Sequence, residues 1–253
     1  MLAERIGMLC HDRRGTVHIL AVIPARYGAQ RFPGKPLADL GGRPVIEWVY
    51  EAASSCPHFD AVVVATDDER IARCVEGFGG EVELTRGDHP SGTDRVAEVA
   101  ERRPDADVVV NVQGDQPFAE AAMLTALVQP YLDGGRPAMT TLACPLAPEA
   151  RDDLNTVKVV CDLAGNALYF SRSPIPSSGP ALQHLGLYAF TREAVLHFPT
   201  LAPTALERQE RLEQLRALEH GVQIRVCRTN RPVIEINTPE DLVAAAPMTS
   251  GRS

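Results

Sequence analysis

The stretch 21-AVIPARYGAQRFPGKPL-37 decides the fold that this sequence predicts. It continues an apolar run from Val17 to Ile23, which is typical of a strand covered on both faces. Pro24 has no N–H group to donate, so we expect strand pairing to end there. A loop with glycines and cations follows, and a helical pattern begins near Pro44. Strand, cationic loop and helix in this order are typical of phosphate binding.

The spacing within this loop excludes two common nucleotide-binding motifs. In a Walker loop, four residues separate the first glycine from the sequence Gly-Lys-Ser/Thr. Here five residues separate Gly28 from Gly34, and Pro36 follows the lysine. The dinucleotide pattern G-x-G-x-x-G does not occur either. One interpretation of the loop is a solvated basic turn. The other is a triphosphate site with three cations, Arg26, Arg31 and Lys35.

Strand and helix patterns alternate through the first half of the chain. We expect strands at 60–67, 81–84, 107–115 and 138–144, with helices at 71–78, 94–102 and 119–132. This alternation predicts parallel crossovers in an α/β fold with a doubly wound, mostly parallel sheet. Ligands of such sheets bind beyond the carboxyl ends of the strands, where the polar motifs of this sequence fall.

The pattern changes after Pro145. Residues 156–162 and 167–171 predict a β-hairpin, and 184–190 predict another strand. We therefore expect a smaller antiparallel β insertion within one domain. The remaining elements are a helix at 208–219, strands at 222–227 and 233–237, and a helix that begins at Thr238 with Pro239 and Asp241 in its first turn.

Composition narrows the functional classes. The net charge of −8 argues against a nucleic-acid-binding protein, although a nucleotide substrate needs only a local cationic site. No apolar run approaches the roughly 20 residues that span a membrane. The six cysteines are scattered without a C-x-x-C pair, which indicates reduced thiols and a cytoplasmic location. Residues 1–16 lack the apolar segment of a signal peptide, and we expect a mobile N-terminal extension there.

Ordered motifs across residues 20–243 resemble the 3-deoxy-manno-octulosonate (Kdo) cytidylyltransferases, the CMP-Kdo synthetase family. The resemblance begins with Pro24-Ala-Arg and Arg31-Phe-Pro-Gly-Lys-Pro-Leu37 in the stretch quoted above. The further motifs are Ala65-Thr-Asp67, Thr85-Arg-Gly-Asp-His-Pro-Ser-Gly-Thr93, Asn111-Val-Gln-Gly-Asp115, Tyr169-Phe-Ser-Arg172, His184-Leu-Gly186, Leu212-Glu-Gln-Leu-Arg216 and Thr238-Pro-Glu-Asp-Leu242.

This resemblance implies a Mg²⁺-dependent enzyme that transfers CMP from CTP to a small anionic acid, Kdo or a related 2-keto sugar acid, and releases pyrophosphate. It implies catalytic roles for Arg26, Lys35 and Asp115, with Asp115 as a metal ligand. The nucleotide would be bound by Arg26, Arg31, Lys35, Ser91, Gly92, Thr93 and Gln113. The acceptor acid would be bound by Gln113, Arg172, His184, Tyr188, Glu213 and Gln214.

The resemblance also implies a domain organisation and a homodimer. A single nucleotidyltransferase domain would cover residues 17–246, with 145–222 binding the acceptor and forming the dimer face. Residues 247–253 would be a tail. From the sequence alone, Thr93 is equally well explained as the N-cap of the helix at 94–102, because its hydroxyl can satisfy a free backbone N–H.

The sequence departs from the family pattern in three places. Gln116 stands where the family often has Glu, and the loop 173–180 is short. Asn237 stands where the family places an aspartate that is the second metal ligand; its carbonyl oxygen can bind a hard cation but supplies no charge. Glu235, two residues earlier, would share its strand face and compensate. These departures leave two alternatives: CMP transfer to a small phosphonate such as phosphonoformate, and a non-catalytic CTP-binding homologue.

Overall fold

The computed structural model describes residues 17–28 and 32–250. Within that part, seven strands form the main sheet in the order β11-β7-β10-β6-β1-β4-β5, and the hairpin β8–β9 joins its β10 side. All main strands run parallel except β10, which is antiparallel to both of its neighbours. The strands are β1 (Ile19–Ala25), β4 (Ala61–Thr66), β5 (Glu81–Leu84), β6 (Val108–Asn111), β7 (Met139–Pro145), β10 (Leu182–Thr191) and β11 (Ile224–Arg228).

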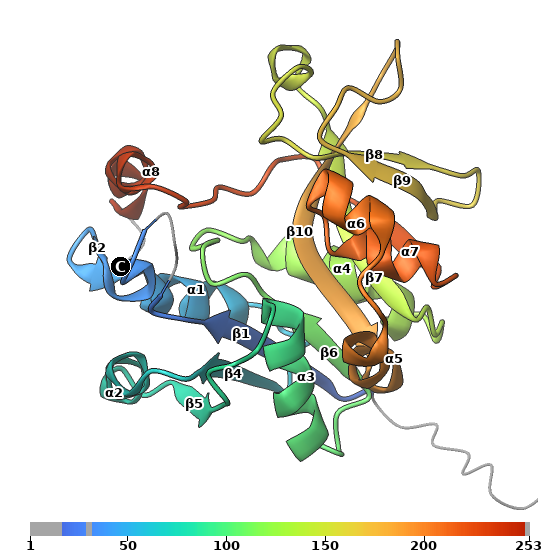
Figure 1. Cartoon of the computed structure of the whole chain (residues 1–253). Helices are drawn as coiled ribbons and strands as arrows, with labels where there is room; N and C mark the ends of the chain where they lie inside the picture. Colours follow the sequence, from blue (N-terminus) through green and yellow to red (C-terminus); the bar gives the residue numbers. More distant parts are fainter. Residues whose placement is uncertain (1–16, 29–31, 251–253) are drawn as a thin grey trace, which may run out of the picture.

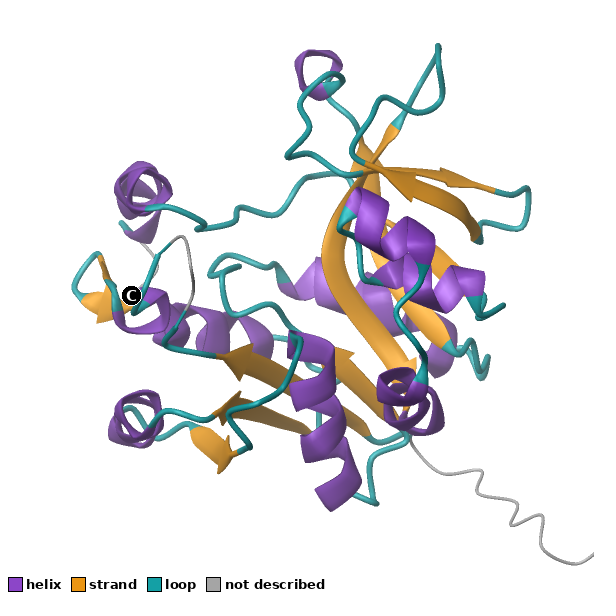
Figure 2. Ribbon diagram, viewed as in Figure 1, coloured by secondary structure: helices purple, strands orange, loops and turns teal. Residues whose placement is uncertain are grey.

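Helices cover both faces of this sheet, as the doubly wound prediction requires (Figures 1 and 2). One face packs against α1 (Val45–Ser54), α2 (Glu69–Gly77), α4 (Ala121–Leu132) and α8 (Pro239–Ala245). The other packs against α3 (Gly92–Arg102), α5 (Arg192–His197) and α7 (Gln214–Glu219). Valines dominate the central strands because these strands have an apolar environment on both sides.

The expected end of strand pairing at Pro24 is wrong, since β1 continues to Ala25 and pairs Pro24 with Ala65 of β4. The carbonyl of Val22 accepts a hydrogen bond from Val112 at 2.9 Å, on the β6 side of the strand. Pro24, two residues later, faces that same side beyond the end of β6. Its missing N–H group therefore costs no bond of the ladder.

Two elements of the C-terminal part differ from the prediction. The helix expected at 208–219 is divided into α6 (Ala205–Glu210) and α7, because Arg211 between them is left-handed with φ of 55°. The strand expected at 233–237 is absent from the described residues. This segment is extended, and Ile236 donates its N–H to the Asp115 carbonyl at 2.8 Å, outside any ladder.

The predicted hairpin and the predicted last helix are confirmed. β8 (Lys158–Cys161) and β9 (Ala167–Ser171) form the antiparallel hairpin, which lies next to α6 and α7 at the upper right of Figure 1. α8 begins at Pro239 with a capping box between Thr238 and Asp241. The predicted tail begins within a 3₁₀ helix at Ala246–Thr249, and the predicted extension at 1–16 lies outside the described residues. No helix in the described ranges is long and apolar enough to cross a membrane.

Candidate active site at the carboxyl ends of the strands

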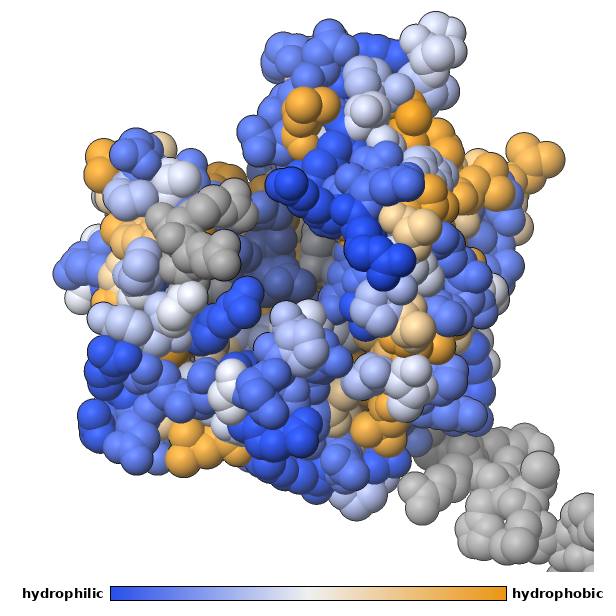
Figure 3. Space-filling model, viewed as in Figure 1, coloured by the Kyte–Doolittle hydropathy of each residue, from blue (hydrophilic) through white to orange (hydrophobic). Residues whose placement is uncertain are grey.

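A polar cavity of about 530 Å³ lies beyond the carboxyl ends of β1 and β6. Figure 3 shows this side of the molecule hollowed, with hydrophilic residues around the hollow. Backbone and side chains from the loop after β1, the loop before α3 and the loop after β6 meet here, which is where doubly wound sheets bind ligands. The lining residues used below are Arg26, Lys35, His89, Ser91, Gly92, Arg95, Gln113, Gly114, Asp115 and Asn237.

Lys35 and Asp115 form an ion pair at the centre of this lining. Lys35 Nζ donates to Asp115 Oδ2 at 2.8 Å, although 80 residues separate them in the sequence. Gly34 allows this approach: its φ of 76° is left-handed, and its N–H donates to the Tyr27 carbonyl at 2.8 Å. Gly114 is equally constrained, because an added Cβ would lie 2.8 Å from the Pro24 carbonyl oxygen.

Of the other two predicted phosphate-binding cations, the structure describes Arg26 but not Arg31. Arg26 lines the cavity, is exposed, and makes no ion pair with any residue in 17–28 or 32–250. Its guanidinium is therefore available to a ligand. Arg31 lies outside the described residues, so its predicted contact with the triphosphate stays a prediction.

The loop before α3 borders the opposite side of the cavity. Ser91 is the N-cap of α3, with its hydroxyl donating to Asp94 Oδ2 at 2.6 Å and accepting from the Asp94 N–H at 3.3 Å. The alternative that Thr93 caps this helix is therefore wrong. Thr93 is 3% exposed, donates to Glu213 Oε2 at 2.6 Å, and does not itself line the cavity.

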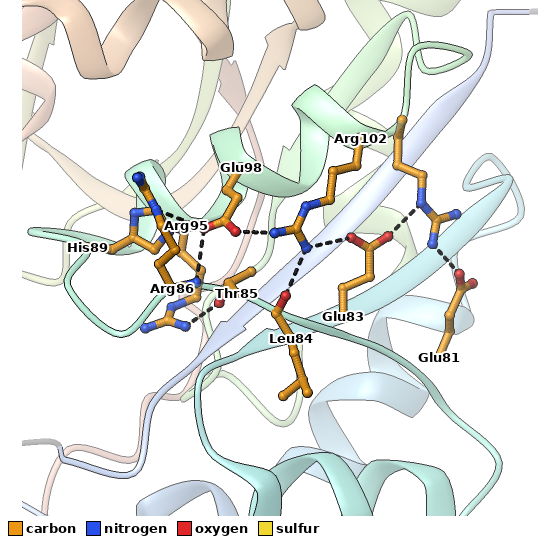
Figure 4. A network of polar contacts seen from close by, with 10 residues as sticks. Glu81, Glu83, Leu84, Thr85, Arg86, His89, Arg95, Glu98 and Arg102 are labelled. Atoms are coloured by element: carbon orange, nitrogen blue, oxygen red, sulfur yellow. Dashed lines mark hydrogen bonds and ion pairs between the residues drawn. The ribbon is translucent and has the colours of Figure 1, made fainter.

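An extended ion-pair network supports this loop from behind (Figure 4). Glu98 of α3 receives the Arg86 N–H at 3.1 Å and is paired with Arg102 and with the imidazole of His89. Burial alone would raise the pKa of the Glu98 carboxyl, but the hydrogen bonds from His89 and from the Arg86 N–H outweigh it, and the pKa lies below the usual range. The network fixes His89, whose side chain is only 4% exposed, at the cavity wall.

Arg95 contributes a buried cation to the same wall. Its side chain is 5% exposed and its Nη2 lies 3.0 Å from Asp67 Oδ1 at the end of β4, while Nη1 donates to Thr85. Sequence reasoning did not assign a role to Arg95 or His89. The available signal was that both fall within or beside the quoted loop motif 85–93.

The three predicted metal ligands lie close together around the end of β6. Asp115 and Asn237 line the cavity, while Glu235 does not. Asn237 Nδ2 donates to Glu235 Oε2 at 3.1 Å and Gln116 Nε2 donates to Glu235 Oε1 at 3.2 Å. Both oxygens of Glu235 thus have amide partners. Burial, and then the charge of Asp115, raise the pKa of the Glu235 carboxyl.

This donor set fits a hard cation shared with a phosphate. Because Nδ2 of Asn237 donates to Glu235, its Oδ1 is the atom available to the cavity, next to the carboxylate of Asp115. Mg²⁺ prefers one or two carboxylates together with substrate phosphate oxygens. Among the described residues there is no group of three or more His, Cys, Asp or Glu side chains that would hold a metal ion without such a substrate.

The predicted acceptor-binding residues come from β10, from the start of α7 and from the segments that follow β6 and β9, and they divide into two sets. Gln113 lines the cavity and donates to the Gly186 carbonyl at 2.9 Å. Glu213 and Gln214 lie at the start of α7. The buried atoms Glu213 Oε1 and Gln214 Nε2 have no hydrogen-bond partner in the described part of the chain. Burial raises the pKa of the Glu213 carboxyl.

The second set is engaged with the protein itself. His184 is 7% exposed, bonds Thr141 Oγ1 at 2.9 Å, and has its pKa lowered to about 3 by burial. Its ring packs 5.6 Å from that of Tyr188, whose pKa is raised by burial. Arg172 donates to the Glu210 carbonyl at 3.0 Å and to the Leu154 carbonyl at 3.1 Å, so its guanidinium also holds the hairpin in place.

Asn111 is a polar residue of this region to which the sequence analysis assigned no role. It is the last residue of β6, follows three valines, and is 1% exposed. Its Oδ1 is buried without a partner among the described residues. The signal in the sequence was an amide at the end of an otherwise apolar strand.

Comparison with known proteins agrees with the fold. The family model described as cytidylyltransferase matches residues 20–224. A 3-deoxy-manno-octulosonate cytidylyltransferase of Acaryochloris marina is 59% identical over 235 residues, covering 90% of this chain and 96% of that protein. The protein of the same name from Synechococcus elongatus is 51% identical over 243 residues, covering 93% of this chain and 100% of its own length.

Solved structures lead to the same group. A CMP:2-keto-3-deoxy-manno-octonic acid synthetase complexed with CTP superposes with a TM-score of 0.88 at 37% identity, covering 93% of this chain and 100% of that chain. A 4-diphosphocytidyl-2C-methyl-D-erythritol synthase of Anaerococcus prevotii, at 17% identity and a TM-score of 0.64, shares the fold, with 93% and 97% of the two chains covered. The chain therefore belongs to the cytidylyltransferase family, among the 3-deoxy-manno-octulosonate cytidylyltransferases.

Proposed function

We propose that this protein transfers CMP from CTP to 3-deoxy-manno-octulosonate (Kdo), forming CMP-Kdo and pyrophosphate. The observation that carries the proposal is the cavity itself: Lys35, Arg26 and Asp115 meet there beyond the first core strand. Cations and a carboxylate on one wall suit a nucleoside triphosphate that shares a divalent cation with the protein. The relatives at 59% and 51% identity, named for Kdo, support this acceptor over a small phosphonate.

The protein's part in this reaction is to place the reactants and stabilise charge. A hydroxyl oxygen of the acid attacks the α-phosphorus and gives up its proton to solvent, the bond to the β-phosphate oxygen breaks, and pyrophosphate leaves with the charge. Lys35 and Arg26 face that charge across the cavity and neutralise it as it grows. Lys35 needs to move little to follow this charge, because its Nζ already lies at the cavity, 2.8 Å from Asp115 Oδ2.

Asp115 and Asn237 would hold Mg²⁺, with Glu235 behind them. When bound, Mg²⁺ polarises the α-phosphate and orients the acceptor oxygen. Glu235 fixes the amide of Asn237 through the bond from Nδ2, so that the carbonyl oxygen is presented to the cavity. The aspartate that the family places at 237 is thus replaced by an amide with a carboxylate 3.1 Å behind it.

The base and ribose would lie against the loop before α3. Gly92 and Ser91 line the cavity there, and the network around Glu98 holds the loop in place. Because the Ser91 hydroxyl is engaged with Asp94, backbone groups of the loop are the available partners for the base edge. Thr93 acts indirectly, since its hydroxyl positions Glu213 on the acceptor side.

The quaternary structure and the division of the domain belong to the same proposal. Residues 17–246 would form one domain in which 145–222 bind the acceptor and mediate a homodimer. Three leucines on and beside the hairpin support this, because large apolar side chains exposed together mark interaction surfaces. They are Leu154, Leu163 and Leu168, with exposures of 60%, 110% and 62%. Free thiols at all described cysteines support a cytoplasmic location.

Pyrophosphate release from CTP and Mg²⁺ tests the proposal, with Kdo, phosphonoformate or no acid as acceptor. We expect release with Kdo and none without an acid. Turnover with phosphonoformate but not with Kdo would refute the assigned acceptor. CTP binding without release for either acid would instead favour the non-catalytic alternative.

A further inference from the structure

Five buried side-chain atoms have no hydrogen-bond partner within residues 17–28 and 32–250, two of them Gln116 Oε1 and Thr204 Oγ1. The other three are Asn111 Oδ1, Glu213 Oε1 and Gln214 Nε2. Asn111 and Gln214 are 1% and 3% exposed. Polar atoms this deeply buried almost always have a partner, so three in one region indicate that something polar completes them.

The three side chains belong to one face of the sheet. Along β6, Val108 and Val110 face one core cluster and Val109 faces the other, so Asn111 continues the face of Val109. That face is covered by α3 and α7. α7 begins at Gln214, directly after Glu213, which the Thr93 hydroxyl of α3 holds at 2.6 Å.

Asn111 lies directly opposite Tyr188 in the antiparallel pairing of β6 and β10. Residues opposed in this way point to the same face, with Cβ atoms about 4.5–5.5 Å apart. Tyr188 was assigned to the acceptor by resemblance, and the charge of Glu213 raises its pKa, after burial. Asn111 therefore lies within the set of side chains assigned to the acceptor, and Gln113, two residues on, leads from it to the cavity.

The chemistry of these atoms selects the kind of ligand. Neither Oδ1 nor Nδ2 of Asn111 has a partner in the described part of the chain, so the amide offers an acceptor and a donor together. A hydroxyl group, which both donates and accepts, matches an amide in either orientation. A phosphonoformate anion offers acceptor oxygens only, and would leave Asn111 Oδ1 unsatisfied.

We infer that Asn111 is a further acceptor-binding residue, whose side-chain amide hydrogen-bonds a hydroxyl group of the sugar acid. This inference rests on the proposed function, and it extends that function by assigning a polyhydroxylated acid rather than a small anion to the site. Asn111 acts on binding and does not touch the reacting phosphate. Its removal consequently raises the KM for the sugar acid and leaves the KM for CTP unchanged.

The test compares Asn111→Ala and Asn111→Ser with a matched control. Thr140→Val removes a buried polar group of the same sheet, since Thr140 is 0% exposed and donates to the Leu127 carbonyl at 2.9 Å on the opposite face. For Asn111→Ala we expect the KM for Kdo to rise roughly tenfold or more, with the KM for CTP changed less than about twofold. Asn111→Ser, which keeps a hydrogen-bonding group, should recover part of that loss.

The melting temperature separates binding from structure. Thr140→Val loses a buried hydrogen bond and should melt below the wild type, whereas Asn111→Ala removes a buried oxygen without a partner and should be destabilised less. Only Asn111→Ala should raise the KM for Kdo. An unchanged KM for Kdo in both Asn111 variants would overturn the inference, and so would an equal rise in Thr140→Val. If the wild type releases no pyrophosphate from CTP and Kdo, the proposed function itself fails. If the wild type turns over normally and the Asn111 variants keep its KM for Kdo, only the inference about Asn111 fails.

Discussion

The Lys35→Ala substitution removes the ammonium group that we assign to the triphosphate. Lys35 Nζ lies 2.8 Å from Asp115 Oδ2, with 14% of the Lys35 side chain and 25% of that of Asp115 exposed. An ion pair that reaches solvent contributes about 0–1 kcal/mol to stability, so the variant should remain folded. Loss of one charge contact to the reacting phosphate should lower kcat roughly 10²–10³-fold, or about 3–4 kcal/mol of activation free energy.

The assay is pyrophosphate release at saturating CTP and Kdo, together with the melting temperature of each variant. Arg43→Ala is the matched control. Its guanidinium pairs with Glu47 and Glu51 at 2.8 Å each, is 32% exposed, and lies outside the residues that line the cavity. Both variants should lose little stability, and only Lys35→Ala should lose activity. A Lys35→Ala enzyme within about threefold of the wild-type rate would refute the assignment of Lys35 to the leaving phosphates.

Three further predictions follow from the same contacts. Burial lowers the pKa of His184 to about 3, so below about pH 6.5 the unfolded chain takes up a proton that the folded chain excludes. Acid should therefore destabilise the wild type by up to about 1.4 kcal/mol per pH unit relative to His184→Gln. An equal difference in unfolding free energy between the two proteins at pH 7.5 and at pH 5.5 would contradict this. Gly114→Ala places a Cβ 2.8 Å from the Pro24 carbonyl oxygen and should cost about 1–3 kcal/mol of stability; an unchanged urea midpoint would exclude that contact. Leu168→Lys places a charge at a position whose leucine is 62% exposed on the hairpin. Analytical ultracentrifugation should then show monomers in place of the proposed dimer, with an unchanged circular dichroism spectrum. A dimer that persists in this variant would exclude the hairpin from the interface.

Local patterns predicted the architecture well because most elements follow their own periodicity. The apolar strands, the alternating helices and the capping box at Thr238 are all local signals, and the structure confirms them. Two of the errors, at Arg211 and at 233–237, depended on tertiary context. The break at Arg211 needs a left-handed backbone that the helical pattern of its neighbours does not reveal, and 233–237 has strand-like composition but only one main-chain bond to the Asp115 carbonyl.

The position of the site could be predicted from the motifs that follow strands. The roles of single residues were harder to predict where they depend on contacts with distant parts of the chain. Lys35 and Asp115 meet because β1 and β6, which they follow in the chain, are neighbours in the parallel part of the sheet. The sequence could not reveal that both oxygens of Glu235 accept from amides, or that Arg172 donates to the carbonyls of Glu210 in α6 and of Leu154. All of these bonds except that of Asn237 to Glu235 join residues at least 18 positions apart in the chain, and each single residue has an ordinary alternative.

A crystal structure with bound CTP tests the central claim most directly. We predict the triphosphate within hydrogen-bonding distance of Lys35 and Arg26 and the base against Gly92, with Asp115 turned toward the α-phosphate. The claim would be contradicted by CTP bound elsewhere, for example in the second cavity of about 610 Å³ at the opposite ends of the strands, which Arg136 lines.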